Sequence, residues 1–505
     1  MKFTATQIFD GSKFLKNQAV QVTDRQITKV STSAFPAKGL LLPGIIDSHI
    51  HLLGMGLALQ APDLVGVTSP QDFRGRIKAY ADAHPQGWIV GRGWDQNKLG
   101  FIPEREFLDE ICPQRPLVLY RICGHVLSAN SQVLDLAGIG PNSPDIPGGT
   151  IRREQTGRPT GVLDEAAMLL LDPIIPLPDR SILYSALEKA FKYAWSCGVT
   201  GIQTDDLEQV GDYEKLYQLY HSITQGMPLR VQLHHRVKKV SQIQDFARLR
   251  KEIAITPGSL VTLGAAKLFL DGSLGARTAA LQEPYSDAPS ERGVLVWRDE
   301  EFFPLVSTAV ALDVPLAIHV IGDAAIEQAL NALENAKAGP GHRLIHCQVT
   351  TKAQMRRMAD LGVVAEIQPG FLNTDMHWIE DRLGPLRLQT SYSWLSLWEA
   401  GTTLAGGSDA PVEDMNPWLG INAAVTRSDP EGCTAQGWQK DERLSLTQAL
   451  QIYTKNNAPL AGWNAGELVP GCAADLAWYP DFDYDNLAGN KPQWTIINGE
   501  RVFAR

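Results

Sequence analysis

The chain has 505 residues, of which 44% are hydrophobic and 20% are charged, a composition typical of a soluble globular protein. Its net charge of -10 and its lack of Lys/Arg clusters argue against a nucleic-acid partner. No apolar run approaches the roughly 20 residues that span a bilayer, and the first residues contain no signal-peptide core, so we expect no membrane association.

The cysteines are scattered along the chain, without a Cys-x-x-Cys pair. They are Cys112, Cys123, Cys197, Cys347, Cys433 and Cys472. This pattern favours free thiols in a reducing cytosol over a disulfide framework. We therefore expect a cytoplasmic protein.

Short strands are predicted near both ends of the chain. They are Gln18–Val22, Gln26–Val30, Asp475–Tyr479 and Trp494–Ile497. Asn498 and Gly499 then form a tight-hairpin signal. Neither end can close a core alone, so we predict a composite β-sandwich domain made of residues 1–44 and 464–505.

Between the two ends, predicted strands alternate with amphipathic helices. The strands are Leu41–His51, Gly198–Asp206, Leu229–Val237, Leu260–Leu270, Val314–Val320, Arg343–Gln348, Val363–Gln368 and Thr402–Asp409. The helices are Ser181–Ser196, Tyr213–Thr224, Ser241–Ile253, Glu300–Leu312, Ala324–Lys337, Lys352–Leu361, Thr390–Ala400 and Leu446–Lys455. This rhythm predicts an α/β fold, a TIM (β/α)8 barrel over residues 45–463. An open doubly wound sheet is the alternative, but no Gly-x-Gly-x-x-Gly follows the first strand.

Residues 52–180 interrupt this alternation, because the interval is far too long for a connection between a strand and its helix. It contains strand-like Trp88–Gly91 and Leu117–Ile122, and a Pro/Gly-rich stretch over residues 140–161. We predict an inserted subdomain over the mouth of the barrel, where loops carry function in barrel enzymes.

His49 and His51 end the first predicted barrel strand, in the run Leu-Leu-Pro-Gly-Ile-Ile-Asp-Ser-His-Ile-His. Alternate residues of a strand share one face, so both imidazoles point the same way and suit a divalent metal. An isolated His-x-His is more often a structural pair, so the metal interpretation requires further ligands.

Candidate ligands follow at the carboxyl ends of later strands: Lys267, His319, His346 and Asp409. Each alone is more often structural, but strand ends of a parallel barrel converge on one face, where the active site is expected. A desolvated lysine with a depressed pKa can react with carbon dioxide to give a carbamate, which can bridge two metals. The alternative is that Lys267 pairs with Asp271 or another acid.

The order His-x-His, Lys, His, His and Asp resembles the amidohydrolase superfamily. Further motifs are Gly-Trp-Asp at Gly93–Asp95, Gly-His-Val-Leu-Ser-Ala-Asn-Ser at Gly124–Ser131, Pro-Gly-Gly-Thr-Ile-Arg-Arg at Pro147–Arg153, Pro-Thr-Gly-Val-Leu at Pro159–Leu163, Asp-Gly-Ser-Leu-Gly-Ala-Arg-Thr-Ala-Ala-Leu at Asp271–Leu281 and His-Val-Ile-Gly-Asp-Ala-Ala at His319–Ala325. They are similar to those of the YtcJ-like metal-dependent hydrolases, which include N-substituted formamide deformylases. The resemblance covers essentially the whole chain.

This resemblance implies a barrel with a composite β domain and a centre of one or two divalent metal ions, most typically zinc. The implied ligands are His49, His51, Lys267, His319, His346 and Asp409, with carboxylated Lys267 as an option. One departure is that relatives usually carry an acid before the strand-six histidine, where this chain has Ile345. The outer support of His346 is therefore an open question.

As a mechanism, we expect a metal-activated water as the nucleophile, with Asp409 taking its proton and passing it to the leaving group. Trp94, His125 and Arg277 are candidate substrate contacts. Trp94 could equally belong to the subdomain core, His125 could be structural, and Arg277 could pair with Asp271 or Glu283.

The leading function is hydrolysis of a carbon–nitrogen bond in a small non-peptide amide, for example an N-substituted formamide or a cyclic amide. The same metal site could instead act on an ester or lactone, or run an isomerase or decarboxylase reaction. A small-molecule binding protein on a barrel scaffold is the non-enzyme alternative. A small-molecule substrate is the expected partner, and the sequence leaves the oligomeric state open, a homodimer included.

Overall fold

The computed structural model describes residues 1–122, 124, 126–146, 149–253, 259–428 and 437–505. The chain divides into two compact units. The first consists of Met1–Leu52 together with Glu188–Arg505, and the second is Leu53–Leu187. The first contains a barrel and a sheet built from both termini, and the second contains a separate sheet inserted after the first barrel strand.

Eight parallel strands form the barrel, in the order in which they follow one another along the chain. They are β5 (Ile45–Ile50), β11 (Val199–Thr204), β12 (Arg230–Arg236), β13 (Val261–Phe269), β14 (Leu316–Val320), β15 (Arg343–His346), β16 (Val364–Ile367) and β17 (Thr403–Gly406). Backbone hydrogen bonds from Asp409 to His49 (2.8 Å) and from His51 to Ala410 (2.9 Å) link the first strand to the segment after the last. The barrel is thus nearly closed, and the predicted TIM-type fold is confirmed.

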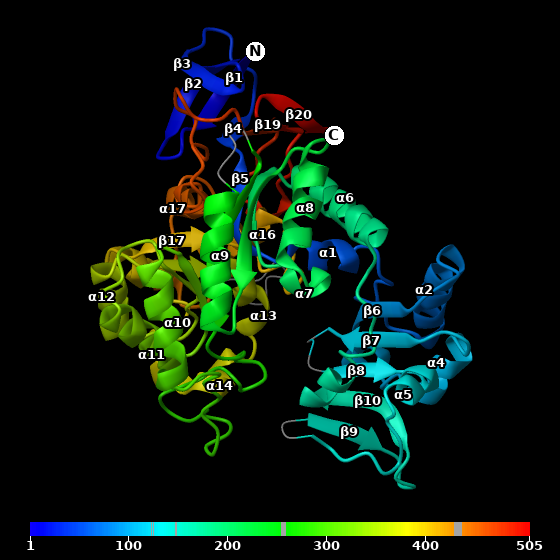
Figure 1. Cartoon of the computed structure of the whole chain (residues 1–505). Helices are drawn as coiled ribbons and strands as arrows, with labels where there is room; N and C mark the ends of the chain where they lie inside the picture. The colour runs from blue at the N-terminus through cyan, green and yellow to red at the C-terminus, as the bar shows by residue number, and fades with distance from the viewer. Residues whose placement is uncertain (123, 125, 147–148, 254–258, 429–436) are drawn as a thin grey trace. The chain divides into compact units, whose positions relative to one another are not determined.

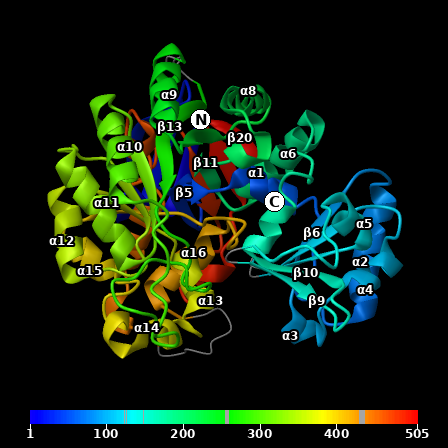
Figure 2. The same ribbon diagram turned by 60° about the horizontal axis from the view of Figure 1, so that its bottom comes forward.

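Helices follow the strands and lie along the outer side of the barrel, as α9 to α12 do in Figure 2. They are α6 (Arg180–Ser196), α7 (Leu207–Val210), α8 (Tyr213–Thr224), α9 (Val240–Glu252), α10 (Asp299–Ala311), α11 (Asp323–Asn335), α12 (Lys352–Asp360), α13 (Leu372–Asp375), α14 (Ile379–Leu388), α15 (Trp394–Glu399), α16 (Pro417–Thr426) and α17 (Leu446–Ile452). In α8, Asp212 caps the first turn by accepting from the backbone N–H of Lys215. Leu216, Tyr220 and Ile223 recur at helical spacing and are buried. The sequence predicted no helix where α16 lies.

The two terminal segments form one seven-stranded sheet, which lies at the top of Figure 1. The strands are β1 (Lys2–Phe9), β2 (Phe14–Thr23), β3 (Gln26–Thr32), β4 (Leu40–Pro43), β18 (Leu476–Tyr479), β19 (Trp494–Ile497) and β20 (Glu500–Ala504). Ile27, near one edge, shares a core with Leu476 and Ile496 from the other half, so the expected sandwich is a single curled sheet. The β19–β20 turn has positive φ at Asn498 (50°) and Gly499 (76°), as a tight hairpin requires.

The stretch predicted as one strand, Leu41–His51, is two strands that separate at Gly44. β4 pairs with β1 and β18 in the terminal sheet, whereas β5 pairs with β11 in the barrel. The backbone N–H of Gly44 still bonds to Asp475 of the terminal sheet, and that of Ile45 already bonds to Gly198 of the barrel. A Cβ at Gly44 would lie 2.1 Å from the Thr200 hydroxyl, so only glycine fits at this transfer between sheets.

The inserted unit contains a five-stranded sheet in the order β6-β7-β8-β10-β9. Its elements are α1 (Leu52–Ala58), α2 (Pro70–Ala83), β6 (Ile89–Trp94), α3 (Gln96–Leu99), α4 (Arg105–Ile111), β7 (Leu117–Arg121), β8 (Val126–Ala129), α5 (Ser131–Leu136), β9 (Gly149–Arg153) and β10 (Pro159–Glu165). Phe73 of α2 and Leu108 of α4 pack against the sheet. The strands predicted at 88–91 and 117–122 are present, whereas the Pro/Gly-rich region 140–161 contains β9 and the start of β10. Its placement over the barrel mouth remains a prediction.

Four of the six cysteines lie within the described residues, and all four are free and buried. They are Cys112, Cys197, Cys347 and Cys472. Cys123 and Cys433 lie outside the described residues. Among the helices that the structure describes, none combines the length and the apolar character needed to cross a membrane.

Candidate metal centre

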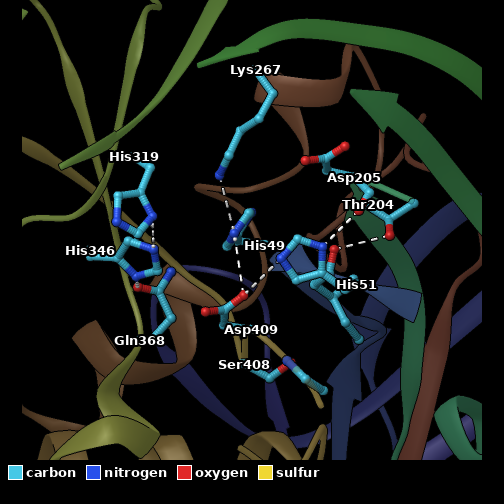
Figure 3. A network of polar contacts seen from close by, with 12 residues as sticks. His49, His51, Thr204, Asp205, Lys267, His319, His346, Gln368, Ser408 and Asp409 are labelled. Carbon is cyan, nitrogen blue, oxygen red and sulfur yellow. Dashed lines mark hydrogen bonds and ion pairs between the residues drawn. The ribbon is translucent and has the colours of Figure 1, made fainter. Parts of the chain in front are cut away.

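The six predicted ligand side chains meet at the carboxyl ends of the barrel strands (Figure 3). They are His49 in β5, His51 just after it, Lys267 in β13, His319 in β14, His346 in β15 and Asp409 after β17. The ligand atoms of His49, His346 and Asp409 all lie within 4.8 Å of one another. The barrel therefore brings together residues that are more than 350 positions apart, from His49 to Asp409.

The Asp409 carboxylate lies between His49 of β5 and His51, which directly follows that strand. Its Oδ1 is 3.2 Å from His51 Nε2 and 3.4 Å from His49 Nε2. Burial alone would raise the pKa of Asp409, but the neighbouring His51, His346 and Lys267 lower it below its usual value. Burial lowers the pKa of His51, but Asp409 outweighs this effect and raises it to about 9. Asp409 is therefore an anion at neutral pH.

Asp47 holds the first strand and the Asp409 segment in register. Its carboxylate accepts from the backbone N–H of His49 (3.0 Å) and of Ser408 (3.1 Å). Asp409 itself has φ of 57°, a left-handed conformation that points the side chain away from the course of β17. Burial raises the pKa of Asp47 to about 7. The Asp in the Pro-Gly-x-x-Asp motif thus acts on backbone geometry, two residues before the first ligand.

Three of the histidines donate one ring N–H to an oxygen on the side away from the centre. His51 Nδ1 is 2.7 Å from the Asp205 carbonyl, and His319 Nε2 is 3.1 Å from the Gly272 carbonyl. These oxygens can only accept, so each ring carries a proton on that nitrogen. Such outer partners set which nitrogen faces a metal.

His346 is held in the same way by Gln368, whose Oε1 lies 2.7 Å from His346 Nδ1. The amide orientation is set because Gln368 Nε2 donates to the Glu366 carbonyl. The acid expected before His346 is absent, since Ile345 is fully buried among apolar residues. Gln368 therefore supplies the support that Ile345 cannot. Sequence reasoning missed this role, although Gln368 ends a predicted strand, as the ligands do.

Whether these residues fit a metal can be judged from the two nitrogens of His319 and His346 that face each other. His319 Nδ1 and His346 Nε2 are 3.0 Å apart, yet the outer partners place each ring's proton on its other nitrogen. Burial lowers the pKa of both rings, that of His346 to about 4, so neither ring carries a second proton. Two lone pairs face each other beside the Asp409 carboxylate. A divalent cation removes this repulsion, and imidazole with carboxylate is a donor set that zinc prefers.

Lys267 adjoins these ligands, with its Nζ 3.3 Å from His49 Nε2. The side chain is fully buried, and burial lowers its pKa to about 8. Among the described residues, no carboxylate forms a salt bridge with it. The carboxylate of Asp271, the alternative partner, accepts from the backbone N–H of Ile321 and Gly322 instead. Lys267 therefore has no salt-bridge partner among the described residues. Its amine faces the other ligands and is a candidate for carboxylation.

Two of the predicted substrate contacts, Trp94 and Arg277, have their polar groups paired within their own units. Trp94 is 1% exposed in the core of the inserted unit, and its Nε1 donates to the Leu119 carbonyl. The structural alternative for Trp94 is thus the one observed. Arg277 forms a bidentate pair with Asp287 (2.7 and 3.0 Å), rather than with Asp271 or Glu283. His125 lies outside the described residues.

Two aromatic rings that sequence reasoning did not single out border the histidines. Phe371 stacks on His346 with ring centroids 5.8 Å apart, and Phe269 lies 5.2 Å from His319. The Arg236 guanidinium lies over Phe269, 4.5 Å from the ring centroid, and pairs with Asp205. The centre therefore has aromatic contacts on the side of β13 to β16.

Comparisons with known proteins agree with this geometry. The model of the Amidohydrolase family matches residues 37–503. The putative amidohydrolase YtcJ of Bacillus subtilis is 34% identical over 483 residues, 92% of this chain and 89% of that protein. The N-substituted formamide deformylase of Arthrobacter pascens is 29% identical over 462 residues, 86% of this chain and 82% of that protein. The crystal structure of an uncharacterized metal-dependent hydrolase from Pyrococcus horikoshii superposes with a TM-score of 0.79 and 25% identity, covering 97% of this chain and 100% of that one.

Proposed function

Because the chain belongs to the amidohydrolase family, we propose that it is a metal-dependent hydrolase of a carbon–nitrogen bond in a small non-peptide amide. The substrate class is an N-substituted formamide or a cyclic amide, in line with the named activity of the Arthrobacter pascens relative. The observation that carries the proposal is the close approach of His319 Nδ1 and His346 Nε2 (3.0 Å), with an oxygen partner at the other nitrogen of each ring, beside the anionic Asp409.

The metal is held by the residues that converge at the strand ends. The proposed ligands are His49, His51, Lys267, His319, His346 and Asp409, which suit one or two ions, with zinc favoured by the imidazole and carboxylate donors. Zinc bound there would polarise a substrate carbonyl and lower the pKa of water to about 7.

Asp409 is the proposed proton carrier. As a buried anion, its carboxylate can accept a proton from the attacking water and donate it to the leaving nitrogen, which departs as a neutral amine. The proton carrier must stay oriented during this exchange. The backbone N–H of Asp409 bonds to the His49 carbonyl (2.8 Å), and the preceding N–H of Ser408 bonds to Asp47.

Lys267 is proposed to be carboxylated when the centre is filled. Its depressed pKa increases the fraction of free amine, whose nitrogen adds to carbon dioxide and loses a proton to give an anionic carbamate. The carbamate would give Lys267 two anionic oxygens with which to help hold one or two ions. The protonated lysine, by contrast, would repel them.

Turnover by the purified full chain tests the proposal. Zinc- and manganese-supplemented protein would be incubated with a panel of N-substituted formamides, cyclic amides and lactones, while formate, amine and ring-opened acid are quantified. We expect amide hydrolysis that disappears after chelation and returns with metal. Hydrolysis of lactones alone, or tight binding of panel members without turnover, would contradict the proposed reaction.

A further inference from the structure

The pairing of β12 with β13 contains one extra residue on β13, directly before the lysine of the metal centre. Leu233 pairs with Leu263, but His235 pairs with Ala266, so two residues of β13 lie opposite His234 alone. These two residues are Gly264 and Ala265. Such a β-bulge is a means of redirecting the side chains that follow it.

This bulge decides which side of the strand Lys267 occupies. A Cβ on Gly264 would point at the interior side chain of Gln232, 2.8 Å from its Cγ, so position 264 faces inward. Ala265 also faces inward, where it packs with Ala317 and Ile345. In a regular strand, consecutive residues face opposite sides. Lys267 lies two residues after Ala265 and therefore faces inward, whereas an unbroken alternation from Gly264 would turn it toward the outer helices.

The imidazole of His234 holds the bulge together. Its Nδ1 accepts a hydrogen bond of 3.0 Å from the backbone N–H of Ala265. The ring is fully buried, so no solvent could replace this acceptor. Gly264 leaves room for the ring, because a Cβ there would lie 2.5 Å from His234 Nδ1. His234 thus accepts the Ala265 N–H at the bulge, and Gly264 provides the space that the ring needs.

We propose that His234 is a positioning residue of the metal centre. By accepting the Ala265 N–H, it maintains the bulge that directs Lys267 toward His49, and it thereby sets the affinity of the centre for its metal. The proposal rests on the proposed function, since Lys267 is taken as a metal ligand. His234 acts through the backbone of β13 and is assigned no contact with substrate.

Two substitutions separate the hydrogen bond from the bulk of the ring. His234→Asn places a carbonyl oxygen near the position of Nδ1, whereas His234→Gln places its polar atoms farther out, near Nε2. Metal-free full-length protein would be titrated with zinc in competition with a chromophoric chelator. We expect His234→Asn to bind zinc nearly as well as the wild type, and His234→Gln to bind it about 10–100-fold more weakly, the usual cost of losing an outer partner.

His235 provides a matched control on the same strand. Its ring packs between Tyr213 and Phe246, with centroids 4.3 and 5.0 Å away, and its Nδ1 forms no hydrogen bond with the residues that the structure describes. We expect His235→Asn and His235→Gln to bind zinc equally well. If His234→Gln does not fold, Gly264→Ala serves as the second variant, because its Cβ displaces the His234 ring and should weaken zinc binding in the same way.

Crystal structures of the two His234 variants give a readout that needs no metal. We expect Lys267 Nζ to stay near 3.3 Å from His49 Nε2 in His234→Asn and to move away in His234→Gln. A wild-type protein that binds no zinc would refute the proposed function, while the position of Lys267 would still decide the role of His234. Equal zinc affinity of the two variants with Lys267 unmoved would overturn the proposal, even if both lost stability.

Discussion

Two clusters of polar side chains are buried inside the barrel, and they differ in how their atoms pair. In the first, the Arg343 guanidinium crosses the barrel to reach acceptors on three other strands. It bonds to Gln203, to Glu366 (3.1 Å) and to Gln232 (2.8 Å), and also to the Leu460 carbonyl (2.7 Å). Each of these bonds joins a donor to an acceptor, and a cation faces an anion, although Arg343 Nε and Glu366 Oε2 have no hydrogen-bond partner among the described residues.

In the second cluster, the metal centre, Asp409 pairs with His51, but other atoms of the same kind face each other. His319 Nδ1 and His346 Nε2 face each other at 3.0 Å, and Lys267 Nζ lies against His49 without a salt bridge to any acid that the structure describes. A buried polar group without a complementary partner is costly, so this arrangement persists only if something else completes it. The contrast suggests that the Arg343 cluster serves the fold, whereas the histidine cluster serves a bound cation and its chemistry.

Of the changes considered for the two clusters, removing the Asp409 carboxylate should have the largest effect, and this effect should be on catalysis. In Asp409→Asn, the amide can neither accept the water proton nor balance the metal charge, so we expect kcat to fall about 10²–10⁴-fold, as for a lost general base. The measurement is turnover of the best panel substrate at matched zinc content. Full turnover with zinc bound would remove Asp409 from the mechanism.

Removing Arg343 should affect stability rather than chemistry. Arg343→Met leaves Glu366 buried without its cation, both side chains being at most 2% exposed, so we expect a loss of about 3–5 kcal/mol in the free energy of unfolding. Urea denaturation measures this loss. The double variant Arg343→Met/Glu366→Gln, which removes both charges, should recover part of it. Zinc bound per folded chain should not change, and a drop would show that the two clusters are coupled.

Zinc itself should complete the second cluster and leave the first unaffected. A ligand that binds only the folded state stabilises it by about 2.7 kcal/mol at 100 times its Kd. We therefore expect zinc to raise the unfolding midpoint of the wild type and a chelator to reverse the rise. His346→Ala should abolish most of this increase, whereas Arg343→Met should retain it. If zinc leaves the unfolding midpoint unchanged in the wild type and in every variant, the result would argue against a native metal site.

The sequence predicted the parts of this centre that depend on strand order. Strands and helices alternate with clear periodicities, and the ligands stand at strand ends, so a closed barrel brings His319 and His346 together without further information. The same reasoning could not predict events inside a strand. The division at Gly44 depends on which sheet each half joins, and the bulge before Lys267 depends on a single backbone hydrogen bond to His234.

Side-chain partners were predicted least well, because they depend on distances between segments that periodicity does not measure. For Arg277 the sequence left open a substrate contact or a pair with Asp271 or Glu283, whereas the structure pairs it with Asp287. Trp94 was offered as a pocket residue, yet its indole fills the core of the inserted unit and its N–H bonds to a strand carbonyl. The departure at Ile345 was recognised, but its compensation by Gln368 requires knowing that β15 and β16 are neighbours.

The smallest expected effect concerns this compensation and tests whether the outer partners prepare the facing lone pairs. Gln368→Leu removes the acceptor of His346 Nδ1–H, so the ring is free to turn or to change its tautomer, and we expect zinc affinity to fall about tenfold. Gln368→Glu keeps an oxygen in place and should preserve the affinity. Chelator competition measures both variants. If Gln368→Leu binds zinc as tightly as Gln368→Glu, the orientation of His346 must come from β15 and the Phe371 ring rather than from its hydrogen bond.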